Sequence, residues 1–169
     1  MTSGNQLSFI DKPDDAQEKD KLVLFFDGAA RNNPGPAGAG IVIKRNDTTI
    51  GTYGFYLGNK TNNQAEYLAL LLGIIIIKKY LKPNEELTIY GDSELLVQQM
   101  TGRYRVKNPI LQQLFNAVYI LSKDIPITFK HIRRINNSIA DKLANQGIDN
   151  RKEITEEFKR VLNEYHITL

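Results

Sequence analysis

The chain of 169 residues is long enough to form one domain with a buried hydrophobic core. It contains no cysteine, so disulfides, zinc–thiolate sites and cysteine nucleophiles are excluded. Its net charge of +3 is too small to identify a nucleic-acid partner unless the positions of the charges are also considered.

The N-terminal segment, residues 1–20, is polar, shows little periodicity and lacks the apolar core of a signal peptide. We therefore expect a flexible tail there. The most apolar run, residues 68–77, is far shorter than the roughly 20 residues that span a bilayer. These features predict a cytoplasmic protein with no membrane partner.

The first part of the chain predicts three strands. Each is a short apolar or alternating run bounded by turn-forming residues. The first strand is expected to stop at the pair Asp27–Gly28, and the second and third to form a hairpin around Asn46–Asp47. The three predicted strands lie at residues 22–26, 38–44 and 49–57.

A helix is predicted after the third strand. Thr61 and Gln64 have the spacing of a capping box, and the segment 62–81 is apolar nearly all round, which indicates a buried helix. Further along, Pro109 suits the first turn of a helix, and Gly147 is expected to stop a short one. The later elements are a strand at 87–90, helices at 93–100 and 109–122, a strand at 126–132 and a helix at 138–146.

This order of elements predicts an α/β fold with a five-stranded mixed sheet flanked by helices. The first three strands should be antiparallel, and the later ones parallel after the first helix crosses over. A C-terminal amphipathic helix is also expected, because apolar residues recur there at helical spacing. These residues are Ile154, Phe158, Val161 and Tyr165. We therefore divide the chain into a tail at 1–20, a core domain at 21–148 and a helical extension at 149–169.

Four acids stand where such a fold can bring them together: Asp27, Glu66, Asp92 and Asp141. Alone, each has an ordinary interpretation as a turn former, a helix-terminal charge, a helix cap or a solvated charge. Clustered carboxylates raise one another's pKa unless a cation lies among them, and oxygen ligands favour Mg²⁺ or Mn²⁺. Two such ions roughly 4 Å apart can activate a water and stabilise the leaving oxygen of a phosphodiester.

Each acid also lies within a longer motif. The motifs are Asp27-Gly-Ala-Ala-Arg-Asn-Asn-Pro-Gly35, Thr61-Asn-Asn-Gln-Ala-Glu-Tyr-Leu-Ala-Leu70, Tyr90-Gly-Asp-Ser93 and His131-Ile-Arg-Arg-Ile-Asn-Asn-Ser-Ile-Ala-Asp-Lys-Leu-Ala-Asn145. Together they resemble the four motifs of the type 1 ribonuclease H family, in the family's order, over about residues 22–147. The tail and the C-terminal helix lie outside this resemblance.

The resemblance implies a ribonuclease H-like fold with residues 21–148 as the catalytic domain. It implies an endoribonuclease that hydrolyses the RNA strand of RNA–DNA hybrids with two Mg²⁺ ions, Mn²⁺ being the alternative. The products would carry 5′-phosphate and 3′-hydroxyl ends. Asp27, Glu66, Asp92 and Asp141 would be the catalytic residues and the metal ligands.

The substrate must be recognised by a 2′-hydroxyl on one strand, which requires short polar side chains and little base readout. Asn33, Asn62, Asn63 and Gln64 supply amide donors and acceptors for this purpose. The resemblance implies minor-groove contacts for the three asparagines and a DNA-phosphate contact for Thr61, at a helix N-terminus. The alternative role of these residues is loop formation and helix capping.

The sequence departs from the family pattern in two places. Residues 101–108 are too few for the long basic handle of many bacterial members, so the chain resembles the short-loop branch that lacks it; the basic run 103–107 is a possible substitute. The family's mobile catalytic histidine is also in question. Gap-free spacing favours His131, but residues 126–132 alternate like a strand, which would place His131 on the sheet. The resemblance implies Arg134 instead, because the short-loop branch commonly has an arginine at this position, and a cation there could stabilise developing charge.

Two other functions fit less of the sequence. A catalytically silent hybrid-binding module on the same fold would not need all four acids. An integrase- or resolvase-type nuclease would lack the asparagine-rich contacts. The RNA–DNA hybrid is the predicted partner, and we expect a monomer with no obligate protein partner. Whether the chain is a stand-alone enzyme or a piece of a larger polyprotein stays open.

Overall fold

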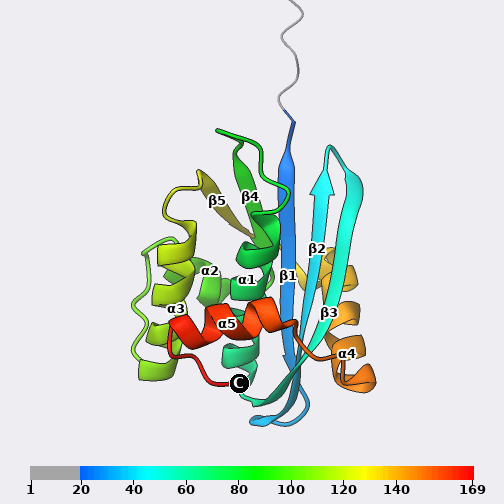
Figure 1. The fold of residues 1–169 in the computed structure, drawn as a ribbon, viewed down its shortest axis with the longest axis vertical. Helices are drawn as coiled ribbons and strands as arrows, with labels where there is room; N and C mark the ends of the chain where they lie inside the picture. Colours follow the sequence, from blue (N-terminus) through cyan, green and yellow to red (C-terminus); the bar gives the residue numbers. More distant parts are fainter. Residues whose placement is uncertain (1–19) are drawn as a thin grey trace, which may run out of the picture.

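The computed structural model describes residues 20–169, which form one mixed sheet with helices on both faces (Figure 1). The strand order is β3-β2-β1-β4-β5. The pairs β1–β2 and β2–β3 are antiparallel, whereas β1–β4 and β4–β5 are parallel, so the predicted sheet is confirmed. The strands are β1 (Leu22–Ala30), β2 (Gly35–Arg45), β3 (Thr48–Lys60), β4 (Leu87–Gly91) and β5 (Ile127–His131). Apart from exposed Asp20, the predicted tail lies outside the described residues.

β1 is longer than predicted, and the expectation that it stops at Asp27–Gly28 was wrong. The strand continues to Ala30, and Asp27 pairs with Gly40 in β2. Gly28 does not form a turn. A side chain there would place its Cβ 2.1 Å from the backbone of Glu66 in the following helix. The glycine therefore lets helix and strand backbones approach closely while the strand runs on.

The helices divide between the two faces of the sheet. α1, α3 and α5 lie on one face and α4 lies on the other (Figure 1), and α2 packs beside α1, where the Tyr67 hydroxyl donates to Gln99 at 2.7 Å. Buried Leu24 and Phe26 of β1 contribute to the core under α1. The helices are α1 (Asn62–Ile77), α2 (Glu94–Met100), α3 (Pro109–Ser122), the 3₁₀ turn η1 (Arg134–Asn137), α4 (Ser138–Asn150) and α5 (Glu156–Glu164).

α1 begins as predicted and ends four residues early. Its capping box is formed by Thr61 and Gln64, but the helix ends at Ile77 rather than at 81. There the exposed Lys78 and Lys79 interrupt the apolar run, and the Lys79 and Tyr80 amides bond to carbonyls three residues back. This tighter hydrogen bonding closes the helix.

α4 passes through Gly147 and ends at Asn150, so the predicted stop at Gly147 was also wrong. A Cβ on Gly147 would lie 2.4 Å from the Phe55 carbonyl oxygen of β3. The same close packing occurs at Gly40, where a Cβ would lie 1.9 Å from the Ala140 carbonyl oxygen. Glycines on both sides thus let α4 lie against the sheet backbone. The helix is terminated by the residue after Asn150, the C-cap Arg151, which has a left-handed backbone with φ 45°.

The C-terminal helix α5 packs onto the α1 side of the sheet. Phe158 and Leu162 are buried in the main core, and the Phe158 ring meets the Phe55 ring edge-on at 5.4 Å between centroids. Lys79, two residues after the end of α1, pairs with Glu157 of α5 at 2.6 Å. In the described part of the chain, no helix is long and apolar enough to cross a membrane.

Candidate active site

Three of the four predicted acids form a tight cluster. One carboxylate oxygen each from Asp27, Glu66 and Asp92 lies within 4.8 Å of the others. Asp27 belongs to β1, Asp92 directly follows β4, and Glu66 extends from α1. Asp141, in the first turn of α4, stands beside this cluster and not within it.

The register of the sheet explains why the two aspartates meet. β1 and β4 are parallel, and their last paired residues are Phe25 and Tyr90. Asp27 and Asp92 each lie two residues beyond this pair, so they are at the same height in the sheet. Because side chains alternate between the two faces of a strand, both aspartates point to the same face as Phe25 and Tyr90. Glu66 reaches them because α1 packs directly on Gly28, where no side chain intervenes.

The fourth acid is brought in by the glycines under α4. Gly40 is the residue of β2 opposite Asp27, and its missing Cβ allows the Ala140 backbone to settle there. Asp141 follows Ala140 directly. Its charge is close enough to add to the raised pKa of Asp27.

The cluster is electrostatically costly without a cation. Burial raises the pKa of Asp27 to about 8, and repulsion from Asp92 and Asp141 adds to this shift, while Arg134 opposes it. Burial likewise raises the pKa of Glu66 well above its usual value, with Asp27 and Asp92 adding to the shift. The Glu66 Oε2 atom is buried and has no hydrogen-bond partner. An all-oxygen group of this kind suits a hard divalent cation, which would offset both the repulsion and the burial.

Arg134 and His131 both lie near the acids but hold different positions. Arg134, in η1, places its Nη2 atom 2.6 Å from Asp141 Oδ1, and its side chain is 76% exposed. His131 is the last residue of β5, as the alternating pattern predicts. Its Nε2 atom lies 3.3 Å from the Asp92 backbone oxygen. The guanidinium therefore contacts an acidic side chain directly, whereas the imidazole is held on the sheet.

Asn137 is a residue of this region that the sequence reasoning missed. It is buried at 2% exposure, and its Nδ2 donates to the Phe26 carbonyl oxygen at 2.8 Å. Its side chain makes no cap at the start of α4, although an Asn before a helix is normally interpreted as a cap. Instead, this hydrogen bond attaches the junction between η1 and α4 to β1 at Phe26, the residue that precedes Asp27.

The predicted substrate-contact residues lie together around the start of α1. The Thr61 amide donates to Gln64 Oε1 at 2.8 Å, and the Gln64 amide donates to Thr61 Oγ1 at 3.3 Å. Asn33 accepts from the Asn62 amide at 3.0 Å, which joins the β1–β2 loop to the helix. Asn62 and Asn63 are exposed. Capping and loop formation are thus roles that Thr61, Gln64 and Asn33 do fill, while the exposed amides remain available to a ligand.

Comparison with known proteins places the chain in a family. Residues 25–147 match the family described as "Reverse transcriptase-like". A bifunctional protein of Mycobacterium tuberculosis is 38% identical over 132 residues, which cover 76% of this chain and 36% of that protein. A ribonuclease HI of Rickettsia conorii is 34% identical over 149 residues, covering 79% of this chain and 95% of that enzyme.

A solved structure is equally similar. The ribonuclease H1 designated LC11, crystallised in complex with an RNA/DNA hybrid, superimposes with a TM-score of 0.74 at 37% identity, covering 77% of this chain and 98% of that one. The fold and the acid cluster therefore define a protein of the ribonuclease H-like class. Within that class, the chain belongs to the type 1 ribonuclease H family. It spans only about a third of the length of the mycobacterial relative.

Proposed function

We propose that this protein is a metal-dependent endoribonuclease that hydrolyses the RNA strand of RNA–DNA hybrids and leaves 5′-phosphate and 3′-hydroxyl ends. The observation that carries the proposal is the convergence of Asp27, Glu66 and Asp92 within 4.8 Å of one another. Asp141 completes the acidic set from α4. The LC11 relative was crystallised with an RNA/DNA hybrid, and its likeness supports the same substrate here.

The four acids would hold two Mg²⁺ ions, with Mn²⁺ as an alternative. When bound, such ions activate water, polarise the phosphate and stabilise the leaving oxygen. Asp27 and Glu66 must lose their protons to become ligands, and the raised pKa values of both groups make this release costly in the metal-free protein. Metal binding should therefore release protons near neutral pH.

Arg134 is our candidate for the cation that assists the leaving group. Its guanidinium stays protonated at every physiological pH, and its exposed side chain is held near the acids by Asp141. Release from Asp141 would let it reach a phosphate at the acid cluster. His131 is the alternative, but its ring rests against the Asp92 backbone at the end of β5.

The asparagines near α1 would read the minor groove. Exposed Asn62 and Asn63 can address 2′-hydroxyls, and Asn33 lies beside them. Gln64 uses its oxygen in the capping box, which leaves its amide nitrogen for the substrate. Thr61 stands at the N-terminus of α1, where a DNA phosphate is favoured.

We also assign the chain to the short-loop branch without a basic handle. The segment between α2 and α3 is a compact turn. Its Gly102 has φ +75°, and the Arg103 and Tyr104 amides both donate to the Gln98 carbonyl. Arg103, Arg105 and Lys107 are exposed on this turn, which suits contact with phosphates. In the same proposal, residues 21–148 form the catalytic domain and residues 149–169 a stabilising extension.

Cleavage of labelled substrates tests the proposed function. RNA–DNA hybrid, duplex RNA, duplex DNA and both single strands are each incubated with Mg²⁺, with Mn²⁺ and with chelator. We expect the RNA of the hybrid to be cut in a metal-dependent manner, with end-labelling showing 5′-phosphates. Cleavage of duplex DNA in preference to hybrid would overturn the substrate assignment.

A further inference from the structure

The acids share their sheet face with a row of aromatic and basic residues. On β1, Val23, Phe25 and Asp27 alternate onto one face; on β4, Thr88 and Tyr90 do the same, and Asp92 continues the alternation directly after the strand. α4 covers this face where it packs on the glycines of β2 and β3. The β4–β5 part is more open. Thr128 and Lys130 of β5, which pair with Thr88 and Tyr90, are exposed.

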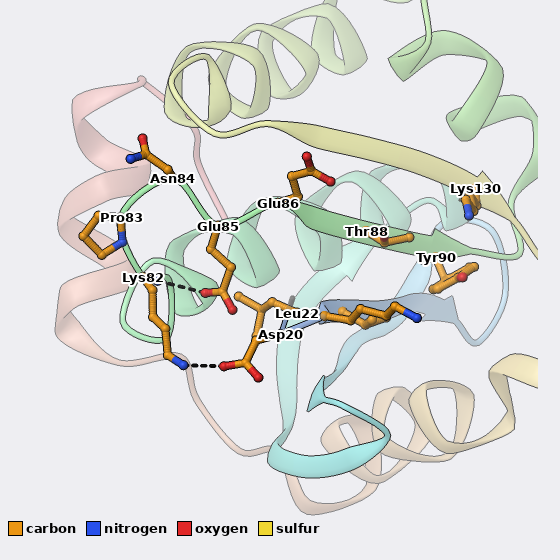
Figure 2. Close-up of a pocket in the computed structure, with 12 residues that line it drawn as sticks. Asp20, Leu22, Lys82, Pro83, Asn84, Glu85, Glu86, Thr88, Tyr90 and Lys130 are labelled. Atoms are coloured by element: carbon orange, nitrogen blue, oxygen red, sulfur yellow. Dashed lines mark hydrogen bonds and ion pairs between the residues drawn. The ribbon is translucent and has the colours of Figure 1, made fainter. Parts of the chain in front are cut away.

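An open groove of about 1080 Å³ occupies this part of the face. Figure 2 shows Tyr90 and Lys130 at one end, with Lys82 and Asp20 at the other. None of the four acids lines the groove, but Tyr90 is its lining residue nearest to Asp92 along the chain. With a rise of roughly 3.3 Å per residue, Tyr90 stands about 6.6 Å along β4 from Asp92. The groove therefore continues the active site down the sheet.

The charges favour an anion at the end of the groove near the acids. At the far rim, Asp20 pairs with Lys82 at 2.5 Å and Glu85 pairs with Arg45 at 3.0 Å, so those acids are neutralised. Near the active site, Lys130 is exposed on β5. Lys44 lies 5.4 Å above the Phe25 ring, and both residues line a small separate hollow beside α4 rather than the groove itself. Glu86 also lines the groove and is the acid there for which no ion pair is observed.

Aromatic rings lie between these cations. Phe25 and Tyr90 stack with ring centroids 5.0 Å apart, and both are only partly buried. Aromatic rings beside lysines are the usual means of binding unpaired nucleotides, because bases contact the rings while phosphates meet the cations. The bases of a duplex are already stacked and paired, so the combination favours single-stranded nucleic acid.

We propose that this groove binds a single-stranded extension of the substrate, an overhang that leaves the acid cluster and runs over Tyr90 and Phe25 between Lys44 and Lys130. The inference rests on the proposed function, because it requires a hybrid at the acids. It adds a substrate preference, namely that hybrids with a single-stranded overhang bind more tightly than blunt ones. Ribose or deoxyribose in the overhang should matter little, because ring and phosphate contacts read neither sugar.

Fluorescence anisotropy measures the preference directly. The Asp27→Asn protein, in which cleavage is blocked, is titrated with a blunt hybrid and with hybrids that carry an overhang of about six nucleotides. RNA and DNA overhangs are placed in turn at the 5′ and the 3′ end. We expect one polarity to bind roughly tenfold more tightly than the blunt hybrid, the gain of one base stacked on an aromatic ring. Equal affinity for blunt and overhang hybrids at both ends would overturn the proposal.

Groove variants separate this site from general hybrid binding. Lys130→Ala and Lys44→Ala should each remove part of the overhang advantage, Tyr90→Ala should remove most of it, and Tyr90→Phe should keep it. Lys123→Ala is the matched control, since this exposed lysine lies at the end of α3 and outside the groove. Equal loss for blunt and overhang hybrids would overturn the proposal. Because Lys130 is exposed, its variants stay informative even if Tyr90→Ala fails to fold.

The salt dependence provides a second measurement. Two phosphates held by Lys44 and Lys130 should steepen the slope of log affinity against log salt by roughly 1.4 for the overhang hybrid relative to the blunt one. Identical slopes would contradict the phosphate contacts. Cleavage of the blunt hybrid by the unaltered protein reports on the proposed function alone, so the failure of one proposal is distinguishable from the failure of the other.

Discussion

The two faces of the sheet are built in different ways. On the α1 face, large apolar side chains fill the space, and α1 itself is buried over nearly its whole length. On the α4 face, backbone meets backbone over several glycines, and Asp141 stands at the edge of that contact; Glu66 comes from α1, at the one point, Gly28, where α1 makes the same close approach. One face therefore contributes mainly apolar burial, which stabilises the fold, and the other fixes positions, which the active site needs.

This difference predicts distinct responses to mutation. Substitutions of the apolar residues on the α1 face should lower stability and leave the chemistry of the folded protein intact. Substitutions at the acids should remove activity while leaving the fold intact, because buried like charges destabilise the metal-free protein in any case.

The largest effect is expected for Asp27→Asn. The amide keeps the shape of the side chain but removes a charged ligand, so kcat should fall by roughly a thousandfold, about 4 kcal/mol in activation free energy. The melting temperature without metal should hold or rise, because the cost of a buried charge is removed. Steady-state kinetics and thermal unfolding check both parts. Turnover near that of the parent would sink the assignment of Asp27 as a ligand.

Truncation after Asn150 tests the other face. It removes α5 and with it the buried Phe158 and Leu162, so unfolding should become easier by about 3–5 kcal/mol after the entropy of the released segment is counted. Chemical denaturation measures this change. An unchanged unfolding free energy would mean that α5 does not stabilise the domain. As a control, kcat is measured at a low temperature where the truncated protein is still folded; a normal kcat there would show that the truncation affects stability and not catalysis.

Arg134→Ala tests the cation at the active-site edge. If the guanidinium assists the leaving group, kcat should fall about a hundredfold. A plain phosphate contact would instead raise KM and leave kcat unchanged. His131→Ala should be mild, and the pH–rate profile should show no limb that disappears with it, because Arg134 does not titrate near neutrality. Severe loss in His131→Ala with a nearly silent Arg134→Ala would reverse the assignment.

The same substitution on the two faces gives a matched comparison. In Gly147→Ala the new Cβ would lie 2.4 Å from a backbone oxygen of β3, so α4 must shift and stability should fall by about 2 kcal/mol. In Gly73→Ala of α1 the nearest atom, at 3.0 Å, belongs to the Leu24 side chain, which can move. Both glycines lie inside helices, so both variants gain about 1 kcal/mol in helix propensity, but this gain should offset most of the cost only at Gly73. Equal destabilisation of the two variants would remove the distinction between the faces.

The contrast between the faces also explains what the sequence could predict. Long apolar runs and capping patterns mark elements locally, so the order of the elements along the chain, the capping box at Thr61 and the limits of α3 follow from them. The same signals are misleading where a glycine is needed because the backbone of another element packs closely against it. Gly28 and Gly147 resemble a turn and a helix stop, yet both are required by a backbone that lies far away in the sequence.

The site divides in the same way. The positions of Asp27 and Asp92 follow from parallel pairing alone, and the family motifs pointed to Glu66 and Asp141. The role of Asn137 could not be predicted, because its partner is a backbone carbonyl 111 residues away. Nor could the groove, since it depends on which part of a sheet face α4 leaves open.

The most gradual effect is expected in the pH dependence of stability in the absence of metal. Asp27 has a folded-state pKa of about 8 against an ordinary value of 3.8, because of burial and the neighbouring acids. A raised carboxyl pKa means that the folded state holds its proton where the unfolded state has lost it. Stability should therefore fall as pH rises from about 4 to about 8. In chelator, the melting temperature should drop steadily over this range, since each 1 kcal/mol of lost stability lowers it by roughly 2–4 °C. Mg²⁺ should remove the decline by pairing with the ionised cluster, and Asp27→Asn should flatten it without metal. A melting temperature that rises with pH in chelator would show that the carboxyls are stabilised as anions by the protein itself, and the cluster would then need no cation to hold its charge.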